Sequence, residues 1–385
     1  MWFFSDEQKM LQDTVRQFAR DELGPKIEHL DAEEGFNRES FHKMGDLGLL
    51  GITVKEADGG AGLGAVEATI AMEEMGAVDA STTLSYLAHA ILCVNQIGSN
   101  GSPEQKKTYL PDLISGKKLG GMGMSEPGAG SDMLSMTTKA VKTAEGYAIT
   151  GGKTWITNGP NGDVFYVYAK TGDTKRDVST FILERGMKGF STGKKFTKMG
   201  MRASPTGELV FEDIRVPATA RVGAEGGSVK MMMKNLDLER VTIAGISLGI
   251  AKGALEAATQ YAKERKQFGK PIGAFQMIQE RLAEGSAWYE SCRALTYGVA
   301  KMFDDGKLDG KEASALSAKA KLQAAQMATK VALDAIQILG GYGYTREFPV
   351  ERMMRDAKLI EIGAGTNEVM RLIIARQMLG DVANL

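Results

Sequence analysis

The chain has 385 residues, more than one hydrophobic core usually serves, so two or three domains are expected. A formal net charge of -1 gives no electrostatic case for binding nucleic acid or an anionic membrane. Two cysteines and three histidines, none with metal-ligand spacing, argue against a disulfide framework and against zinc catalysis. We therefore expect an ordinary globular protein of a reducing compartment, without a metal.

The N-terminal part, residues 1–119, carries apolar residues at helical spacing and predicts a helical domain. Ser5 with Gln8 three residues later indicates a capping box at its first helix. The charged, helical opening resembles neither a signal peptide nor a transit peptide, and no apolar run reaches the roughly 18 residues that span a bilayer. The expected location is a bacterial cytoplasm, or the mitochondrial matrix for a processed eukaryotic form.

The middle part, residues 120–227, changes to a period of two, which is typical of strands. Short runs rich in β-branched and aromatic residues are bounded there by Gly, Asp and Pro. The stretch GYAITGGKTWITNG predicts two strands joined at Gly151-Gly152. This part is expected to be an antiparallel β domain.

The C-terminal part, residues 228–385, is helical again and predicts a domain like a four-helix bundle. Nearly forty residues after Ser228 contain no proline, and a second long run ends at Gly340-Gly341. Three glycines four residues apart let another helix approach the first run closely: Gly245, Gly249 and Gly253. The fold class is therefore a multi-domain α+β protein in the order helices, sheet, helices.

One carboxylate stands on the apolar face of the first long run. Glu239 fills the empty position of a stripe at helical period formed by Met232, Leu236, Ile243, Ile246 and Ile250. Burial without a partner would raise the pKa of Glu239 toward the range of a general base. The alternative is a structural ion pair, with Lys234 or a distant arginine as partner.

Three further segments offer contacts for a planar cofactor with a pyrophosphate. MGMSEPGAGSD (122–132) exposes backbone N–H groups, KTWITNG (153–159) places Trp155 and Thr157 on one side of a strand, and ERKQFGKPIGAFQ (264–276) supplies Arg265. Each has an ordinary alternative: an interdomain loop, a core aromatic, and a cation at a helix C-terminus.

Seven segments, in order along the whole chain, resemble the acyl-CoA dehydrogenase family. They are GLLGITV, GGAGLG, MSEPGAGSD, WITNG, ERKQFGKPIGAFQ, QILGGYGY and RDAKLIEIGAGTNEVMR. The resemblance implies the same three-domain fold, bound FAD and an acyl-CoA substrate that loses hydrogens from Cα and Cβ. It also implies a homotetramer that passes electrons to electron-transfer flavoprotein. VKEADGG (54–60) departs from the family pattern and is interpreted as a local turn variation.

Most members of that family carry Tyr-Glu-Gly where this chain has Gly363-Ala364-Gly365, and that glutamate is their base. The branch that oxidises isovaleryl-CoA instead carries the base in LDLER, which stands here at 236–240. The resemblance thus assigns the base to Glu239 and predicts conversion of isovaleryl-CoA to 3-methylcrotonyl-CoA, a step of leucine breakdown. Gly363 leaves room for a methyl branch.

The resemblance also assigns contacts residue by residue. The backbone N–H of Ala364 is expected to hold the thioester carbonyl while the α-proton leaves. FAD would be bound by Met124, Ser125, Trp155, Ile156, Thr157, Arg265, Gln276, Gln337, Gly340, Gly341, Thr366 and Glu368. Those from Arg265 onward are expected to serve the FAD of a neighbouring subunit. The substrate would lie against Ser131, Tyr168, Ala169, Asp237, Leu238, Arg240, Gly363 and Gly365.

Three other functions are compatible with the same motifs. One is a non-catalytic protein that binds FAD and acyl-CoA after losing its base. Another is an oxidase or monooxygenase that hands hydrogens to oxygen. The third is a dehydrogenase of another short branched or cyclic acyl-CoA, because one methylene gives only about 1–3 kcal/mol of discrimination.

Overall fold

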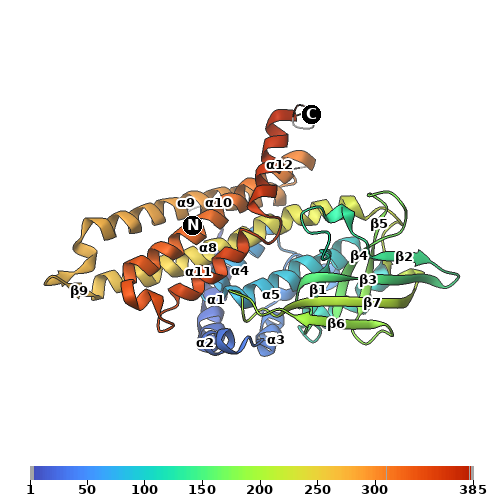
Figure 1. Cartoon of the computed structure of the whole chain (residues 1–385), viewed down its shortest axis with the longest axis horizontal. Coiled ribbons are helices and arrows are strands. Elements are labelled where there is room, and N and C mark those ends of the chain that lie inside the picture. Colours follow the sequence, from blue (N-terminus) through green and yellow to red (C-terminus); the bar gives the residue numbers. More distant parts are fainter. Residues whose placement is uncertain (1–3, 309, 381, 383–385) are drawn as a thin grey trace.

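The computed structural model describes residues 4–308, 310–380 and 382, and its parts follow the order helices, sheet, helices (Figure 1). The expected fold class is confirmed. The helical parts fill the centre and the left of Figure 1, and the sheet lies at the right-hand end.

The N-terminal helices are α1 (Asp6–Phe18), α2 (Gly24–Glu33), α3 (Arg38–Asp46), α4 (Ala65–Gly76), α5 (Ala80–His89), α6 (Asn95–Asn100) and α7 (Pro103–Ile114). The capping box of α1 is confirmed, since Ser5 Oγ accepts the Gln8 N–H at 3.2 Å and the Gln8 side chain accepts the Ser5 N–H at 3.0 Å. A π-helical turn (Ala90–Val94) joins α5 to α6 and is buried throughout. These helices form the layer against which the rest of the chain packs.

The sheet contains β1 (Gly120–Gly123), β2 (Lys139–Lys142), β3 (Gly146–Thr157), β4 (Val164–Lys170), β5 (Val178–Glu184), β6 (Phe190–Lys195), β7 (Thr206–Pro217) and β8 (Arg221–Val222). Among the described residues its order is β6-β7-β3-β2-β4-β5-β8, with β1 beside β4. Most pairs are antiparallel, as expected, but β4 pairs in parallel with β1 and with the end of β2.

The prediction of two strands around Gly151-Gly152 is wrong. Both flanks belong to β3, which pairs with β7 on either side of the glycines, with register shifts between Ile149 and Gly151 and between Lys153 and Ile156. Gly151 has φ +144°, and a Cβ there would lie 2.7 Å from Thr138 Cα. The glycines therefore form a bulge that bends one strand. Thr138 approaches this backbone so closely that residue 151 must have no side chain.

The C-terminal part comprises α8 (Ser228–Glu264), a hairpin of β9 (Lys266–Gln267) and β10 (Lys270–Pro271), α9 (Gln276–Asp304), α10 (Gly310–Leu339), α11 (Val350–Ile360) and α12 (Asn367–Leu379). The close approach predicted at the α8 glycines is confirmed: a Cβ on Gly249 would lie 2.4 Å from the Glu73 carbonyl oxygen of α4. By length and composition α8 could cross a membrane, but 78% of its most apolar window is buried inside the protein, as in a core helix.

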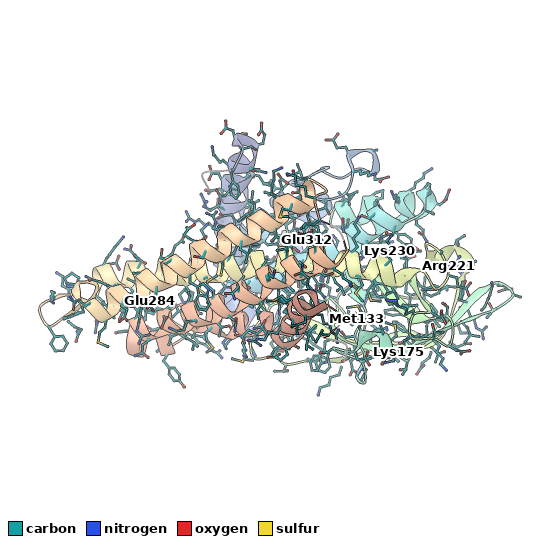
Figure 2. The ribbon with its side chains drawn as sticks, turned by 90° about the horizontal axis from the view of Figure 1, so that it is seen from above. Met133, Lys175, Arg221, Lys230, Glu284 and Glu312 are labelled. Carbon is teal, nitrogen blue, oxygen red and sulfur yellow. The ribbon has the colours of Figure 1, made fainter. Side chains whose placement is uncertain are left out.

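The two ends of α8 lie in different parts of the molecule. Its N-terminal end, with Lys230, lies toward the sheet domain and the β4–β5 loop that contains Lys175, whereas Glu284 of α9 lies toward the opposite end (Figure 2). A buried cluster fixes α4 against α9 beside α8: Glu73 accepts hydrogen bonds from Tyr289, from Arg293 Nε at 2.8 Å and from Tyr297 at 2.6 Å. The helix that carries Glu239 therefore packs beside two helices that this cluster joins to each other.

Candidate active site

Glu239 lies on the buried face of α8, and only 6% of it is exposed. The five apolar residues of its stripe are all buried, so the predicted face is confirmed. In the described chain no hydrogen bond or ion pair reaches its carboxylate, which argues against the ion-pair alternative. Burial raises the pKa of Glu239 to about 7, against the opposing charges of Arg240 and Lys321. The side chain can therefore take up a proton near neutral pH.

The turn at residues 363–365 follows α11 and leads into α12. The Gly363 N–H bonds to the Leu359 carbonyl at 2.8 Å, while Ala364 and Gly365 have φ +55° and +86°. In the described residues no protein acceptor takes the Ala364 N–H. A Cβ added at Gly363 would meet nothing closer than 3.5 Å. The turn therefore offers a free backbone donor next to a position without a side chain, a suitable place for an oxygen that gains negative charge.

Lys321 of α10 links this turn to Glu239, and the sequence reasoning missed it. Its side chain is fully buried and donates to the Gly365 carbonyl oxygen at 2.8 Å and to Asn367 Oδ1 at 3.2 Å. Burial lowers the pKa of Lys321 to about 8, against the raising effect of Glu239. The criterion that identified Glu239, a charged residue on an apolar stripe at helical period, would also have identified Lys321. Lys321 interrupts a buried stripe of α10 that contains Ala318, Leu322 and Ala325.

Asp237 and Arg240 lie one on each side of Glu239 in α8 and bind each other. Arg240 Nη1 donates to Asp237 Oδ1 at 2.7 Å, and Ser314 of α10 donates to Asp237 Oδ2 at 2.8 Å. Arg240 Nε is buried without an acceptor in the described chain, so this arginine keeps a donor for a polar ligand. Leu238 packs against the helical core.

The two substrate residues predicted on β4 have no exposed surface. Tyr168 packs in the same apolar cluster as Met232 and Leu236 of α8 and accepts a hydrogen bond from Gln96 at 3.5 Å. Burial, followed by the charges of Tyr166 and Glu239, raises the pKa of Tyr168 well above its usual value. Ala169 lies in the separate core of the sheet. The structure therefore brings Tyr168, but not Ala169, to Glu239.

The loop of Met124 and Ser125 is fastened to β3 by a buried ion pair. Lys153 Nζ donates to Glu126 Oε1 at 2.7 Å and to the Met124 carbonyl at 3.1 Å, and the Thr154 N–H donates to the Ser125 carbonyl at 2.9 Å. Although burial opposes it, Lys153 lowers the pKa of Glu126 to about 2. The loop is thus held next to the strand that carries the predicted aromatic, and Ser131 further along it is exposed.

Trp155 is an exposed aromatic rather than a core residue. It has φ +60°, 62% of it is exposed, and it stacks on Phe196 with ring centroids 4.3 Å apart. Ile156 points into the core, whereas Thr157 is partly exposed on the side of Trp155. A flat apolar ring beside a hydroxyl, with the 124–125 backbone nearby, fits a planar ring system such as that of FAD.

A second group of predicted cofactor residues lies far from Glu239. Arg265 ends α8, 26 residues after Glu239, which is about 39 Å along the helix. It packs over the Tyr342 ring at 5.7 Å. The other predicted residues of this group are also exposed: Gln276, Gln337, Gly340 and Gly341. One copy of the chain cannot bring this group to Trp155 and Glu239.

Thr366 and Glu368 stand at the start of α12, next to the turn. Thr366 caps the helix by accepting the Val369 N–H at 3.2 Å, and Glu368 is exposed and pairs with Arg371 at 3.2 Å. Both lie within four residues of Ala364. They remain available to a group bound at the outer side of the turn.

Comparison with known proteins gives the same family over the whole chain. Models described as the N-terminal, middle and C-terminal domains of acyl-CoA dehydrogenase match residues 5–117, 121–214 and 227–379. An isovaleryl-CoA dehydrogenase, mitochondrial, of Pongo abelii is 45% identical over 383 residues, covering 98% of this chain and 90% of that protein.

Two further relatives carry other substrate names. An acyl-CoA dehydrogenase of Clostridium acetobutylicum, described as short-chain specific, is 43% identical over 371 residues, 96% of this chain and 97% of that protein. The solved structure of butyryl-CoA dehydrogenase from Megasphaera elsdenii has a TM-score of 0.94 at 38% identity and covers 98% of this chain and 99% of that one.

Proposed function

Since the chain belongs to the acyl-CoA dehydrogenase family of FAD-dependent oxidoreductases, we propose that it oxidises a short branched-chain acyl-CoA, with isovaleryl-CoA as substrate and 3-methylcrotonyl-CoA as product. The observation that carries the proposal is Glu239. It is a buried carboxylate with no partner in the described chain and a pKa of about 7, on the helix beside the turn that offers the free Ala364 N–H. A base is therefore present although the turn itself has none.

The reaction follows from what these residues can hold and move. The Ala364 N–H donates to the thioester carbonyl, so the negative charge that develops on that oxygen is stabilised by a donor already in place, worth roughly 3–4 kcal/mol. The Glu239 carboxylate takes the α-proton, which needs its ionised form. FAD, when bound, supplies the acceptor for the hydride from Cβ. Burial of Glu239 excludes water from the proton transfer.

The branched substrate is supported by the space at Gly363. A Cβ there would already be in ordinary contact with Leu359, at 3.5 Å from its carbonyl oxygen, so the absence of a side chain is what leaves volume beside the turn. A methyl group on Cβ needs such volume, and the 45% identity to an isovaleryl-CoA dehydrogenase agrees with it. The relatives named for short straight chains make butyryl-CoA the natural competitor.

The cofactor site is proposed to be shared between copies of the chain. Met124, Ser125, Trp155 and Thr157 would hold the ring system of FAD, and Arg265, at the far end of α8, would hold the pyrophosphate of a neighbour's FAD. Such sharing requires an oligomer, for which we propose a homotetramer. Electron-transfer flavoprotein is the proposed acceptor of the electrons.

The test is an anaerobic titration of the holoprotein with isovaleryl-CoA, followed by flavin absorbance, beside butyryl-CoA and Glu239→Gln. We expect rapid bleaching by isovaleryl-CoA, slower bleaching by butyryl-CoA and none in the variant. A flavin that stays oxidised with both would support a binding protein instead. Peroxide formed in stoichiometric amount during turnover in air would favour an oxidase.

A further inference from the structure

The ammonium group of Lys321 is the one cation that contacts the catalytic turn in the described part of the chain. It comes from α10, fully buried, and binds the Gly365 carbonyl oxygen at 2.8 Å and Asn367 Oδ1 at 3.2 Å. Burying a lysine is unfavourable unless its donors are satisfied. Both of its acceptors belong to the five-residue segment that contains Ala364.

This contact restricts the direction in which the turn points. Ala364 and Gly365 have left-handed φ values of +55° and +86°, and the Asn367 N–H binds the Glu361 carbonyl at 2.9 Å. Gly363 and Asn367 are thus held by main-chain bonds, while the peptide after Gly365 is held by Lys321 alone among the described side chains. This bond anchors the C-terminal side of the turn, and the Ala364 N–H lies two peptide groups before it in the same turn.

The same charge acts on Glu239. Both side chains are buried, on α10 and α8, which pack against each other, and the charge of Lys321 opposes the rise in the pKa of Glu239 that burial causes. The other groups that face Glu239 are Arg240 on its own helix and Tyr168 on β4, and Lys321 also faces Glu361 and Glu368. Arg240 is already paired with Asp237, so Lys321 is the cation without a carboxylate bound to it.

We propose that Lys321 is a positioning residue for α-proton abstraction: it anchors the turn that presents the Ala364 N–H, and its charge favours the ionised form of Glu239. This inference rests on the proposed function. Lys321 touches neither the substrate's reacting atoms nor the cofactor in this role. It acts through its hydrogen bond to the turn and through the electrostatic effect of its charge on Glu239.

The test separates proton abstraction from hydride transfer. 3,3-Dimethylbutyryl-CoA has α-hydrogens but no hydrogen on Cβ, so exchange of its α-protons in D2O reports the base and the carbonyl donor without any oxidation. Exchange is measured by NMR across pH for the wild type, Lys321→Met and Lys321→Gln. Lys319→Met is the matched control, because it makes the same change two residues earlier on α10, where Lys319 pairs with no carboxylate among the described residues.

Removal of the positive charge raises the proton affinity of Glu239, so the midpoint of the pH profile moves upward. We expect Lys321→Met to lower exchange about tenfold or more at pH 7 and to lower the high-pH plateau as well. Lys321→Gln keeps a donor for the Gly365 carbonyl, so it should shift the midpoint with a smaller loss of plateau. Asn367→Ala keeps the charge and should leave the midpoint in place.

A purely structural lysine would give a different result. If the lysine only supported the fold, both variants would lower the plateau and share the wild-type midpoint, which overturns the inference. If Lys321→Met does not fold, the midpoint of Lys321→Gln decides between the two explanations. A wild-type protein that exchanges no α-protons would instead remove the proposed function itself, and this inference with it.

Discussion

At the scale of single residues, Glu239 meets two opposed demands. The reaction needs its ionised form, whereas burial stabilises the neutral form and sets its pKa near 7. A carboxylate whose pKa is raised on folding binds its proton more tightly in the folded state. Folding stability therefore falls as pH rises from about 4.5 to about 7, the price of holding a base at this place.

Glu239→Gln should accordingly gain stability relative to the wild type as pH rises. The pKa of Glu239 is about 4.5 in the unfolded chain and about 7 in the folded protein. Proton linkage between these two values predicts that the unfolding free energy of the variant rises relative to that of the wild type by about 2 kcal/mol between pH 5.5 and pH 8. Thermal midpoints of both holoproteins at the two pH values measure it. An equal difference at both pH values would show that Glu239 is ionised in the folded protein throughout.

Activity should follow the opposite pH trend. Because only ionised Glu239 accepts the α-proton, the rate constant of flavin reduction should rise with pH through a midpoint near 7. Stopped-flow reduction by isovaleryl-CoA from pH 5.5 to pH 9 gives this midpoint. A rate that is flat across this range would mean that the base titrates at its ordinary value.

Gly363 is predicted to set the width of the acyl site. Its φ is not in the left-handed region and a Cβ meets nothing closer than 3.5 Å, so Gly363→Tyr adds a ring without backbone strain. The ring should lower kcat/KM for isovaleryl-CoA roughly tenfold or more relative to butyryl-CoA, the effect of one methyl group in a filled pocket. Gly363→Ala is the control and should change the ratio little; equal losses for both substrates would contradict the assignment.

At the scale of elements, the flavin-facing loop depends on the ion pair between Lys153 and Glu126. Both side chains are buried, and together they join the 124–126 backbone to β3. Lys153→Met leaves the Glu126 carboxylate buried without its cation, while Thr137 and Thr138 still donate to it, so the loss should be about 3 kcal/mol, the lower end for a broken buried pair, and FAD should be released more readily. FAD fluorescence on dilution and the thermal midpoint measure both effects.

Lys142→Met is the matched control in the same domain. Lys142 pairs with Glu225 at 3.7 Å on the exposed side of the sheet, where an ion pair is worth about 1 kcal/mol or less. The expected result is near wild-type FAD retention. A Lys153→Met protein that keeps FAD equally well would show that the loop is held by its backbone bonds alone.

At the scale of the whole molecule, the proposed cofactor residues form two groups at opposite ends of α8. The N-terminal part of α8, which carries Glu239, lies toward the sheet that carries Trp155 (Figure 1), and Arg265 follows the other end of α8, about 39 Å along the helix from Glu239. Exposed apolar side chains accompany the second group, among them Phe268 at 90% and Met277 at 73%. Exposed apolar groups of this size are typical of surfaces that another chain covers.

A mixed oligomer tests whether the two groups meet across subunits. Arg265→Glu and Glu239→Gln each inactivate every site in a pure oligomer, one by weakening FAD and the other by removing the base. Co-expressed, they should form sites that combine an intact Glu239 from one chain with an intact Arg265 from the other, and part of the activity should return. If the two groups served one chain, the mixture would stay inactive.

Many structural features of this protein could be predicted from local sequence patterns. The three-part order, the α1 capping box and the buried stripe of α8 depend on periodicity and on caps, which neighbouring residues determine by themselves. Glu239 stood out for the same reason, since a polar residue breaks a run whose other members must be buried. The error at Gly151-Gly152 is of the opposite kind: glycines permit a turn and a bulge equally, and only the pairing of β3 with β7 selects the bulge.

What the sequence determined by itself is therefore the class of each segment and, through resemblance, the family and its base. What only the tertiary structure decided is which distant groups meet: Lys321 with the 363–367 segment, Lys153 with Glu126, Trp155 with Phe196. Helix and strand patterns arise from residues a few positions apart, whereas these contacts join residues from 27 to 46 positions apart. Their geometry depends on how whole elements pack, and no short-range pattern contains it.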